Sequence, residues 1–160
     1  MWQKLIETLD KLGEVYDNLA TLGEKKRTAL VAVDMKLLSD ILDVEQLMAA
    51  KIQKLEQKRL ELLKNLSETM AVTATTKAKD FYKKAPSPAV EKNLIRLHDR
   101  LSKNFDRASK ISENNKILAQ CALDAVQRQL NKLSGAAVEP TYSGNGSGIV
   151  THQKKFDFKA

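Results

Sequence analysis

The stretch ILDVEQLMAAKIQKLEQKRLELL, residues 41–63, decides the fold of this chain. Within it, Ile41, Met48, Leu55 and Leu62 recur every seven residues, with further apolar residues beside them. Such a heptad pattern is typical of an α-helix that packs against another helix. A helix of about 33 residues, roughly 50 Å long, is too slender to bury its own apolar face. The stretch therefore predicts a long helix that needs a partner helix.

The residues before this stretch predict the first partner. Six apolar side chains follow one another in steps of three and four, which places them on one stripe of a helix. The pattern is lost near Gly23, where a kink can form, and we expect the helix to reach about Val33. Asp34 suits the N-cap of the next helix because its side chain can accept hydrogen bonds from free backbone N–H groups. The six side chains are Trp2, Leu5, Leu9, Leu12, Tyr16 and Leu19.

A connector and a third long helix follow. Residues 67–89 contain β-branched residues and two prolines, and we expect a short helix there at Phe81 and Tyr82. The pair Ser87 and Pro88 predicts the start of the third helix, because Ser is a good N-cap and Pro is tolerated at the first helical position. Gly135 can end that helix.

Two parts of the C-terminal third differ from the rest. Between residues 119 and 129 the apolar side chains are small except for Leu123, which predicts a close neighbour or a partly open groove. From residue 135 the chain is rich in glycine and has no sustained periodicity, so we expect a flexible tail. The predicted fold is all-α: an elongated antiparallel bundle of three long helices and a short connector helix over 1–134, with a flexible tail over 135–160.

The composition argues against several functions. Residues 1–50 carry six basic and nine acidic side chains, and residues 51–134 carry 18 basic and nine acidic ones. We expect this opposite charge to pair helices within the bundle, although a basic stretch at 51–84 leaves nucleic-acid binding open. No carboxylate pair lies in an apolar setting that would support acid–base catalysis, so an enzyme is not expected.

Cofactor, metal and membrane sites are not expected either. The lone Cys121 fits a small buried apolar residue better than a nucleophile, and with His98 and His152 it makes no credible metal set. No apolar run approaches the roughly 18 residues of a membrane span, so we expect no membrane insertion and a cytoplasmic protein.

Two short motifs carry a family resemblance. They are an Asn-(Asn/Gly)-x-apolar-Leu stretch at 114–118 and a Thr-Tyr-(small)-x-x-Gly element that holds Thr141, Tyr142 and Gly146. With the order of helices across the whole chain, they resemble the FlgN-type flagellar export chaperones. Ile111 stands where many members of that family have a second Asn, and this chain is basic where many members are acidic.

The resemblance implies a function. Chaperones of that family act in type III protein export during bacterial flagellum biogenesis, bind the C-terminal helices of the hook-associated proteins FlgK and FlgL, and deliver them to the export gate protein FlhA. Tyr142 matches the family tyrosine that docks at the gate, and cargo binding falls to the third helix and the tail. The cargo-binding residues assigned on this basis are Asn114, Leu118, Ala122, Val126, Leu130, Leu133, Ile149, Val150, Phe156 and Phe158.

One structural alternative stays open. The heptad seam of residues 41–62 can also be satisfied by a second copy, which would make the protein a self-associating coiled coil without cargo. The sequence alone does not fix the oligomeric state.

Overall fold

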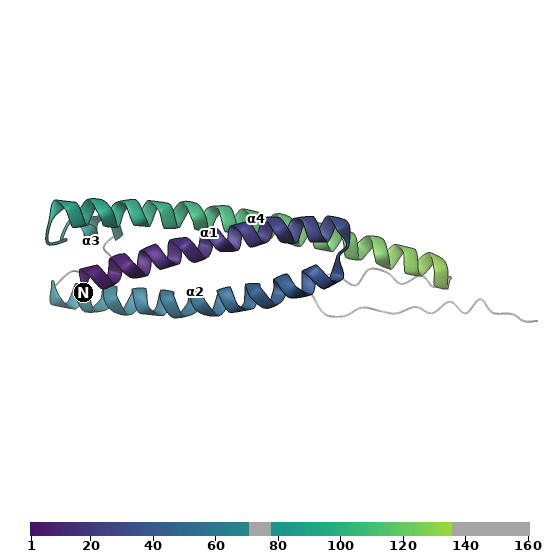
Figure 1. Cartoon of the computed structure of the whole chain (residues 1–160), viewed down its shortest axis with the longest axis horizontal. Helices are drawn as coiled ribbons and strands as arrows, with labels where there is room; N and C mark the ends of the chain where they lie inside the picture. Colours follow the sequence, from purple (N-terminus) through teal and green to yellow (C-terminus); the bar gives the residue numbers. More distant parts are fainter. Residues whose placement is uncertain (71–77, 136–160) are drawn as a thin grey trace, which may run out of the picture. The chain divides into compact units, whose positions relative to one another are not determined.

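The computed structural model describes residues 1–70 and 78–135, and these contain helices and no strands. The long helices are α1 (Trp2–Ala32), α2 (Met35–Thr69) and α4 (Pro88–Ser134), and the short α3 spans Ala78–Tyr82 (Figure 1). The all-α prediction of three long helices and a short connector helix is therefore confirmed. The chain forms two compact units, one over Met1–Asn115 and one that begins at Lys116.

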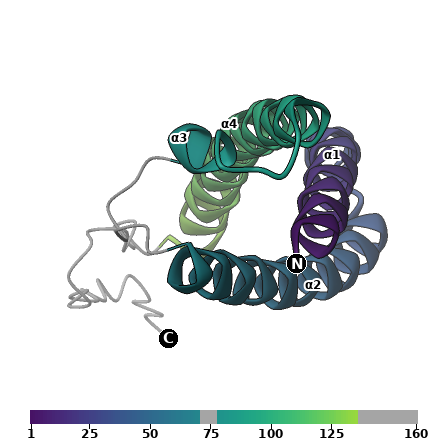
Figure 2. The same ribbon diagram turned by 90° about the vertical axis from the view of Figure 1, so that its left-hand side faces the viewer.

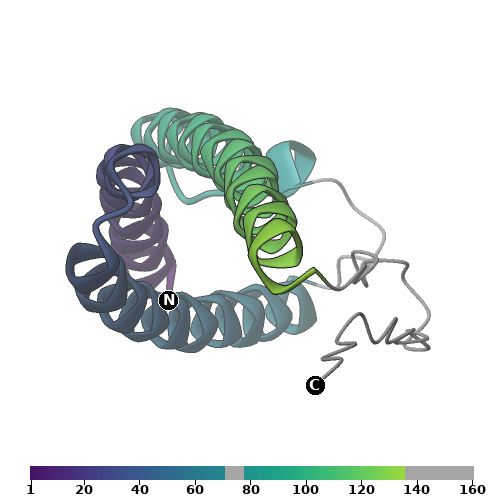
Figure 3. The ribbon, with the colours of Figure 1, turned by 90° about the vertical axis from the view of Figure 1, so that its right-hand side faces the viewer.

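Within the first unit, α1 and α2 form an antiparallel hairpin, and α4 follows α1 in the parallel direction. Both end views place α1 between α2 and α4 (Figures 2 and 3). The parallel direction follows from four hydrogen bonds that join α1 to α4, because all of them link residues 90 to 92 positions apart. Consecutive long helices thus alternate in direction, as the sequence predicts.

The corner between α1 and α2 consists of two residues, Val33 and Asp34. The N–H of Val33 donates to the carbonyl of Leu30 and the N–H of Asp34 to that of Ala29, which is the hydrogen-bond pattern of a Schellman motif. The Asp34 Oδ1 then accepts from the N–H of Leu37 at 3.0 Å, which confirms the predicted N-cap. Val33 has φ 54°, a left-handed conformation that is costly for a β-branched residue.

The core joins the start of α1, the end of α2, α3 and the start of α4. Its fully buried members include Leu5, Leu9, Tyr82 and Leu94. The ring of Phe81 lies 5.5 Å from that of Trp2 on α1, and the ring of Tyr82 lies 5.7 Å from that of His98 on α4, so this aromatic pair packs the short helix against two long ones, as expected. Burial raises the pKa of Tyr82.

The heptad seam of α2 is satisfied largely within the chain. Ile41 and Leu62 are 3% and 8% exposed, and Met48 and Leu55 are half-buried. The two ends of the seam are therefore covered within the chain, and its middle is partly covered.

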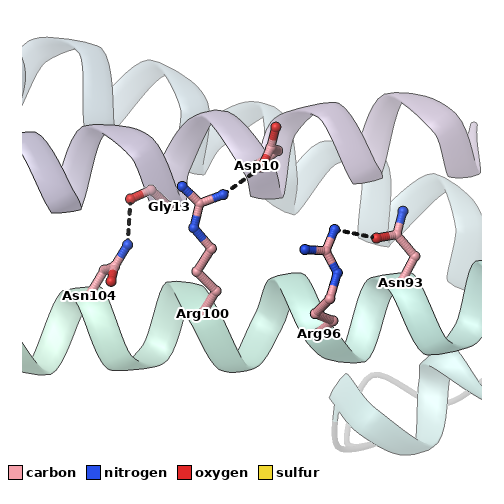
Figure 4. Close-up of polar contacts among 6 residues, drawn as sticks. All are labelled: Asp10, Gly13, Asn93, Arg96, Arg100 and Asn104. Carbon is pink, nitrogen blue, oxygen red and sulfur yellow. Dashed lines mark hydrogen bonds and ion pairs between the residues drawn. The ribbon is translucent and has the colours of Figure 1, made fainter.

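Polar contacts fix α4 against α1. Arg100 pairs with Asp10 at 2.9 Å, and Asn104 Nδ2 donates to the Gly13 carbonyl at 2.9 Å (Figure 4). One turn farther along, Arg107 pairs with Asp17 at 3.1 Å. The expected pairing of acidic and basic helices is confirmed by these two ion pairs.

Helices α1 and α4 make a tight contact at Gly23. Asn115 is 4% exposed, and its Nδ2 donates to the Gly23 carbonyl at 2.7 Å. A Cβ atom at Gly23 would lie 2.6 Å from Cγ2 of Ile111, closer than real Cβ atoms approach a neighbour. Helix α1 continues through Gly23 without interruption, and only glycine leaves room for this contact.

The left-handed corner generates a first prediction. We expect Val33→Gly to raise the free energy of unfolding by about 1 kcal/mol, because relief of a left-handed β-branched residue outweighs the added freedom of the unfolded chain. Val31→Gly is the control, since Val31 is equally exposed but helical, and it should lower the free energy of unfolding by roughly 0.5 kcal/mol. Urea denaturation measures both, and two changes of the same sign would contradict the account of the corner.

The glycines of α1 generate a second prediction. Gly23→Ala should destabilise the protein by about 1–3 kcal/mol, because the new Cβ displaces the stiff side chain of Ile111. Gly13→Ala should stabilise it by roughly 0.5–1 kcal/mol, since the nearest atom to the new Cβ, Arg100 Nε, lies 3.9 Å away. In thermal denaturation, the added change Ile111→Ala should recover part of the Gly23→Ala loss. Equal effects of the two glycine substitutions would contradict the close approach.

Candidate partner-binding site

The second unit presents an apolar stripe on a single helical segment. Its described part is the end of α4, from Lys116 to Ser134, followed by Gly135 in a left-handed conformation that ends the helix as predicted. Four large apolar side chains of the stripe are half exposed or more. They are Leu123 at 51%, Val126 at 54%, Leu130 at 53% and Leu133 at 77%, whereas Ile117, at 57%, lies on the opposite side of the helix.

A row of polar side chains beside the stripe bonds along the helix. Gln120 Nε2 donates to Asp124 at 2.8 Å, and Gln127 Nε2 donates to Asn131 at 3.1 Å. These pairs are four residues apart, so they satisfy one another without help from another helix. The segment therefore has a polar face that needs no partner and an apolar face that gains free energy when another apolar surface covers it.

The predicted cargo residues that the structure describes are accessible. Ala122, Val126, Leu130 and Leu133 are exposed, and Leu118 is half-buried. Their spacing of four, four, four and three places them within one third of the helix circumference. The predicted tail residues Ile149, Val150, Phe156 and Phe158, and the gate residue Tyr142, lie outside the described residues.

The neighbouring residues Asn114 and Asn115 lie in different environments. Asn114 is exposed, whereas the neighbouring Asn115 is buried and bonded to the Gly23 carbonyl. The Oδ1 of Asn115 has no hydrogen-bond partner within the described residues. The assignment of Asn114 to cargo binding stays a prediction. The burial of Asn115 was not predicted, because its partner lies 92 residues away and no local pattern marks it.

One residue was placed wrongly. Cys121 is exposed rather than a small buried apolar residue. It lies about 170° around the helix from the mean direction of Leu123 and Val126, so it stands on the opposite face from these two side chains. Its neighbours in sequence are apolar, and this misled the prediction.

The described residues hold few groups for chemistry. Across 1–70 and 78–135, no three His, Cys, Asp or Glu side chains come together in a way that could hold a metal ion. Helices long and apolar enough to cross a membrane are also not found in that part of the chain. His98 sits at the core boundary, where its Nδ1 lies 3.3 Å from the Tyr82 hydroxyl. The exposed stripe is thus the feature best suited to bind another macromolecule.

Comparisons with known proteins agree with this description. The family model described as FlgN protein matches residues 1–148. The chain is 30% identical to the uncharacterized protein YvyG of Bacillus subtilis strain 168 over 159 residues, which cover 98% of this chain and 97% of that protein. No solved structure matches the chain. The match to the family model spans all four helices, so this protein belongs to the FlgN family of flagellar export chaperones.

Proposed function

We propose that the protein is a cytoplasmic chaperone that binds the C-terminal helices of FlgK and FlgL, prevents their premature assembly and delivers them to the export gate protein FlhA. The family is one of chaperones for flagellar export and not of enzymes, which gives the general role. The specific cargo and the delivery step are the parts proposed here. In this proposal, residues 1–134 form the helical domain that holds cargo, and residues 135–160 form the tail.

The exposed stripe of α4 is the observation that carries the proposal. Val126, Leu130 and Leu133 are each more than half exposed on one helical face. An amphipathic helix of a partner can lay its own apolar side chains against such a face, and the cost of exposing both surfaces to water favours the complex. Cargo that assembles through its terminal helices is then kept apart, because those helices are already covered.

The tail provides a second contact in this proposal. Tyr142 follows the helix by only eight residues, in a stretch rich in glycine. An anchor on a short tether reaches a second partner at high effective concentration while the helix still holds the first. Gate docking through Tyr142 is therefore separable from cargo binding, which α4 shares with the tail residues Ile149, Val150, Phe156 and Phe158.

Substitutions in the stripe test the cargo contact. We expect Val126→Asp with Leu130→Asp to weaken binding of FlgK and FlgL C-terminal fragments by about 100-fold, since two charges would be buried against an apolar helix. Cys121→Asp with Arg128→Gln is the control, because it makes the same charge change on the opposite face. Isothermal titration with full-length chaperone measures both. Unchanged affinity of the stripe variant would refute the proposed contact.

Substitution of the tail tyrosine tests delivery. Tyr142→Ala should keep the affinity for FlgK and FlgL fragments but lose capture of the cytoplasmic domain of FlhA in a pull-down. The control is Thr151→Ala, which also lies in the tail. Tyr16→Ala would not serve as a control, because the Tyr16 ring packs on Phe105 in the bundle. Loss of cargo binding by Tyr142→Ala would contradict the division of roles.

A further inference from the structure

The first unit contains two hollows between α2 and α4. One, of about 380 Å³, is lined by Ile52 and Ala49 of α2, Ala108 and Ser112 of α4, and Leu19 of α1. The other, of about 410 Å³, is bordered by Glu56 and Arg59 of α2, Leu101 and Phe105 of α4, and Tyr16 of α1. Both are open to the surface and follow one another along the same three helices.

Together the hollows offer a seat for the side chains along one face of a helix. On α4 their lining runs from His98 to Asn115, which is about 27 Å of helix. The charged side chains at the edges are already paired within the chain, Lys26 with Glu45 at 2.6 Å and Arg59 with Glu56 at 2.8 Å. The seat therefore suits an apolar helical face and does not call for a charged one.

We propose that the occupant is the 116–133 segment of α4 from a second copy of this chain, exchanged reciprocally in a two-fold dimer. Each chain carries an apolar seat and, separately, an exposed apolar helix. Soluble monomers rarely leave so much apolar surface uncovered. An isologous pairing covers both features twice, because each copy gives its helix and receives the other.

The sequence spacing supports one register for this dimer. In the seat, α4 contributes side chains in steps of three and four, and the 116–133 segment has the same steps and the same length of 18 residues. When two copies of α4 run antiparallel about an axis between residues 115 and 116, the large apolar side chains meet the seat. The pairs are Leu130 with Leu101, Val126 with Phe105, Leu123 with Ala108, and Ala119 with Ser112.

The centre of this register also brings a hydrogen-bond donor close to a buried acceptor. Asn115 lines the first hollow, and its Oδ1 is the buried side-chain acceptor without a partner among the described residues. The register sets Lys116 of the second copy beside Asn115. Its ammonium group is a hydrogen-bond donor, so the pairing brings a donor to the place where the chain holds an unused acceptor.

The dimer would compete with cargo, and this consequence rests on the proposed function. Val126, Leu130 and Leu133 belong to both contacts, so a chain whose segment lies in a second copy cannot bind cargo with it. The free chaperone would then be stored as a dimer with its apolar stripe covered. Cargo would convert the dimer into complexes with one chaperone chain each.

A seat-filling substitution tests self-association. In multi-angle light scattering over a dilution series, we expect the full-length chain to dimerise and Ala49→Trp to weaken the dimer by about tenfold or more, because the indole occupies the seat. Ala50→Trp is the matched control, since Ala50 lies about 100° farther around α2 and does not line the hollow. A monomer at all concentrations, or equal dimer affinity in both variants, would overturn the proposal.

Cross-linking tests the register without relying on a bulky residue. In a Cys121→Ser background, a chain with Ser112→Cys is mixed with a chain with Ala119→Cys, and oxidation should join unlike chains efficiently. A mixture of Ser112→Cys with Arg128→Cys, which the register places apart, should remain largely uncross-linked. Equal yields from the two mixtures would overturn the register.

Addition of cargo separates this proposal from the proposed function. A FlgK or FlgL C-terminal fragment should shift the wild-type dimer to complexes with one chaperone chain, and Ala49→Trp should still bind the fragment. A dimer that forms but does not bind the fragment would contradict the proposed cargo contact and leave the proposed self-association standing. A complex that retains two chaperone chains would overturn the shared use of the stripe.

Discussion

The hydrogen bonds from asparagine side chains of α4 to glycine carbonyls of α1 set the register on which the first unit depends. Asn104 bonds to Gly13 and Asn115 to Gly23, with nearly the same offset along the chain. A glycine lets the two helices approach, and the carboxamide then reaches a carbonyl that already belongs to the helix ladder. Each bond contributes only about 0.5–1.5 kcal/mol, but a slip of α4 by one turn would leave a buried carboxamide unpaired.

This register has consequences for the third helix. Apolar side chains alone tolerate small shifts between parallel helices, because Leu and Ala fill similar positions in successive turns. Polar contacts do not, and the ion pairs of Asp10 with Arg100 and Asp17 with Arg107 lie in the same register. Helix α4 is thereby held against α1, and its face toward α2 is left with open hollows.

Helices and their ends could be predicted from the sequence because they depend on local patterns. The heptads of α2, the Asp34 N-cap, the Ser87 and Pro88 start, and the Gly135 end each use residues within one or two turns of the feature. Val33 and Asn115 could not be predicted in this way. The left-handed conformation of Val33 is imposed by the two-helix corner, and the burial of Asn115 is imposed by a glycine 92 residues earlier.

The candidate site was predicted in part for the same reason. Periodicity finds an apolar stripe, and Val126, Leu130 and Leu133 lie on one, but periodicity cannot say whether another helix of the chain covers it. Cys121 shows the opposite failure, since apolar neighbours in sequence did not place it on the apolar face. Which face of a helix is buried depends on where its partner lies, and only the fold supplies that.

A chaperone for export must combine two properties that oppose each other. It needs an apolar surface to hold a helix from its cargo, and that same surface favours association with any other apolar surface. Charge on the stripe would improve solubility but would also reject the cargo. A reversible cover resolves the conflict, because a cover of moderate affinity hides the stripe in the free state and yields to a better partner. An open seat and an exposed helix on one chain provide such a cover without a second gene product.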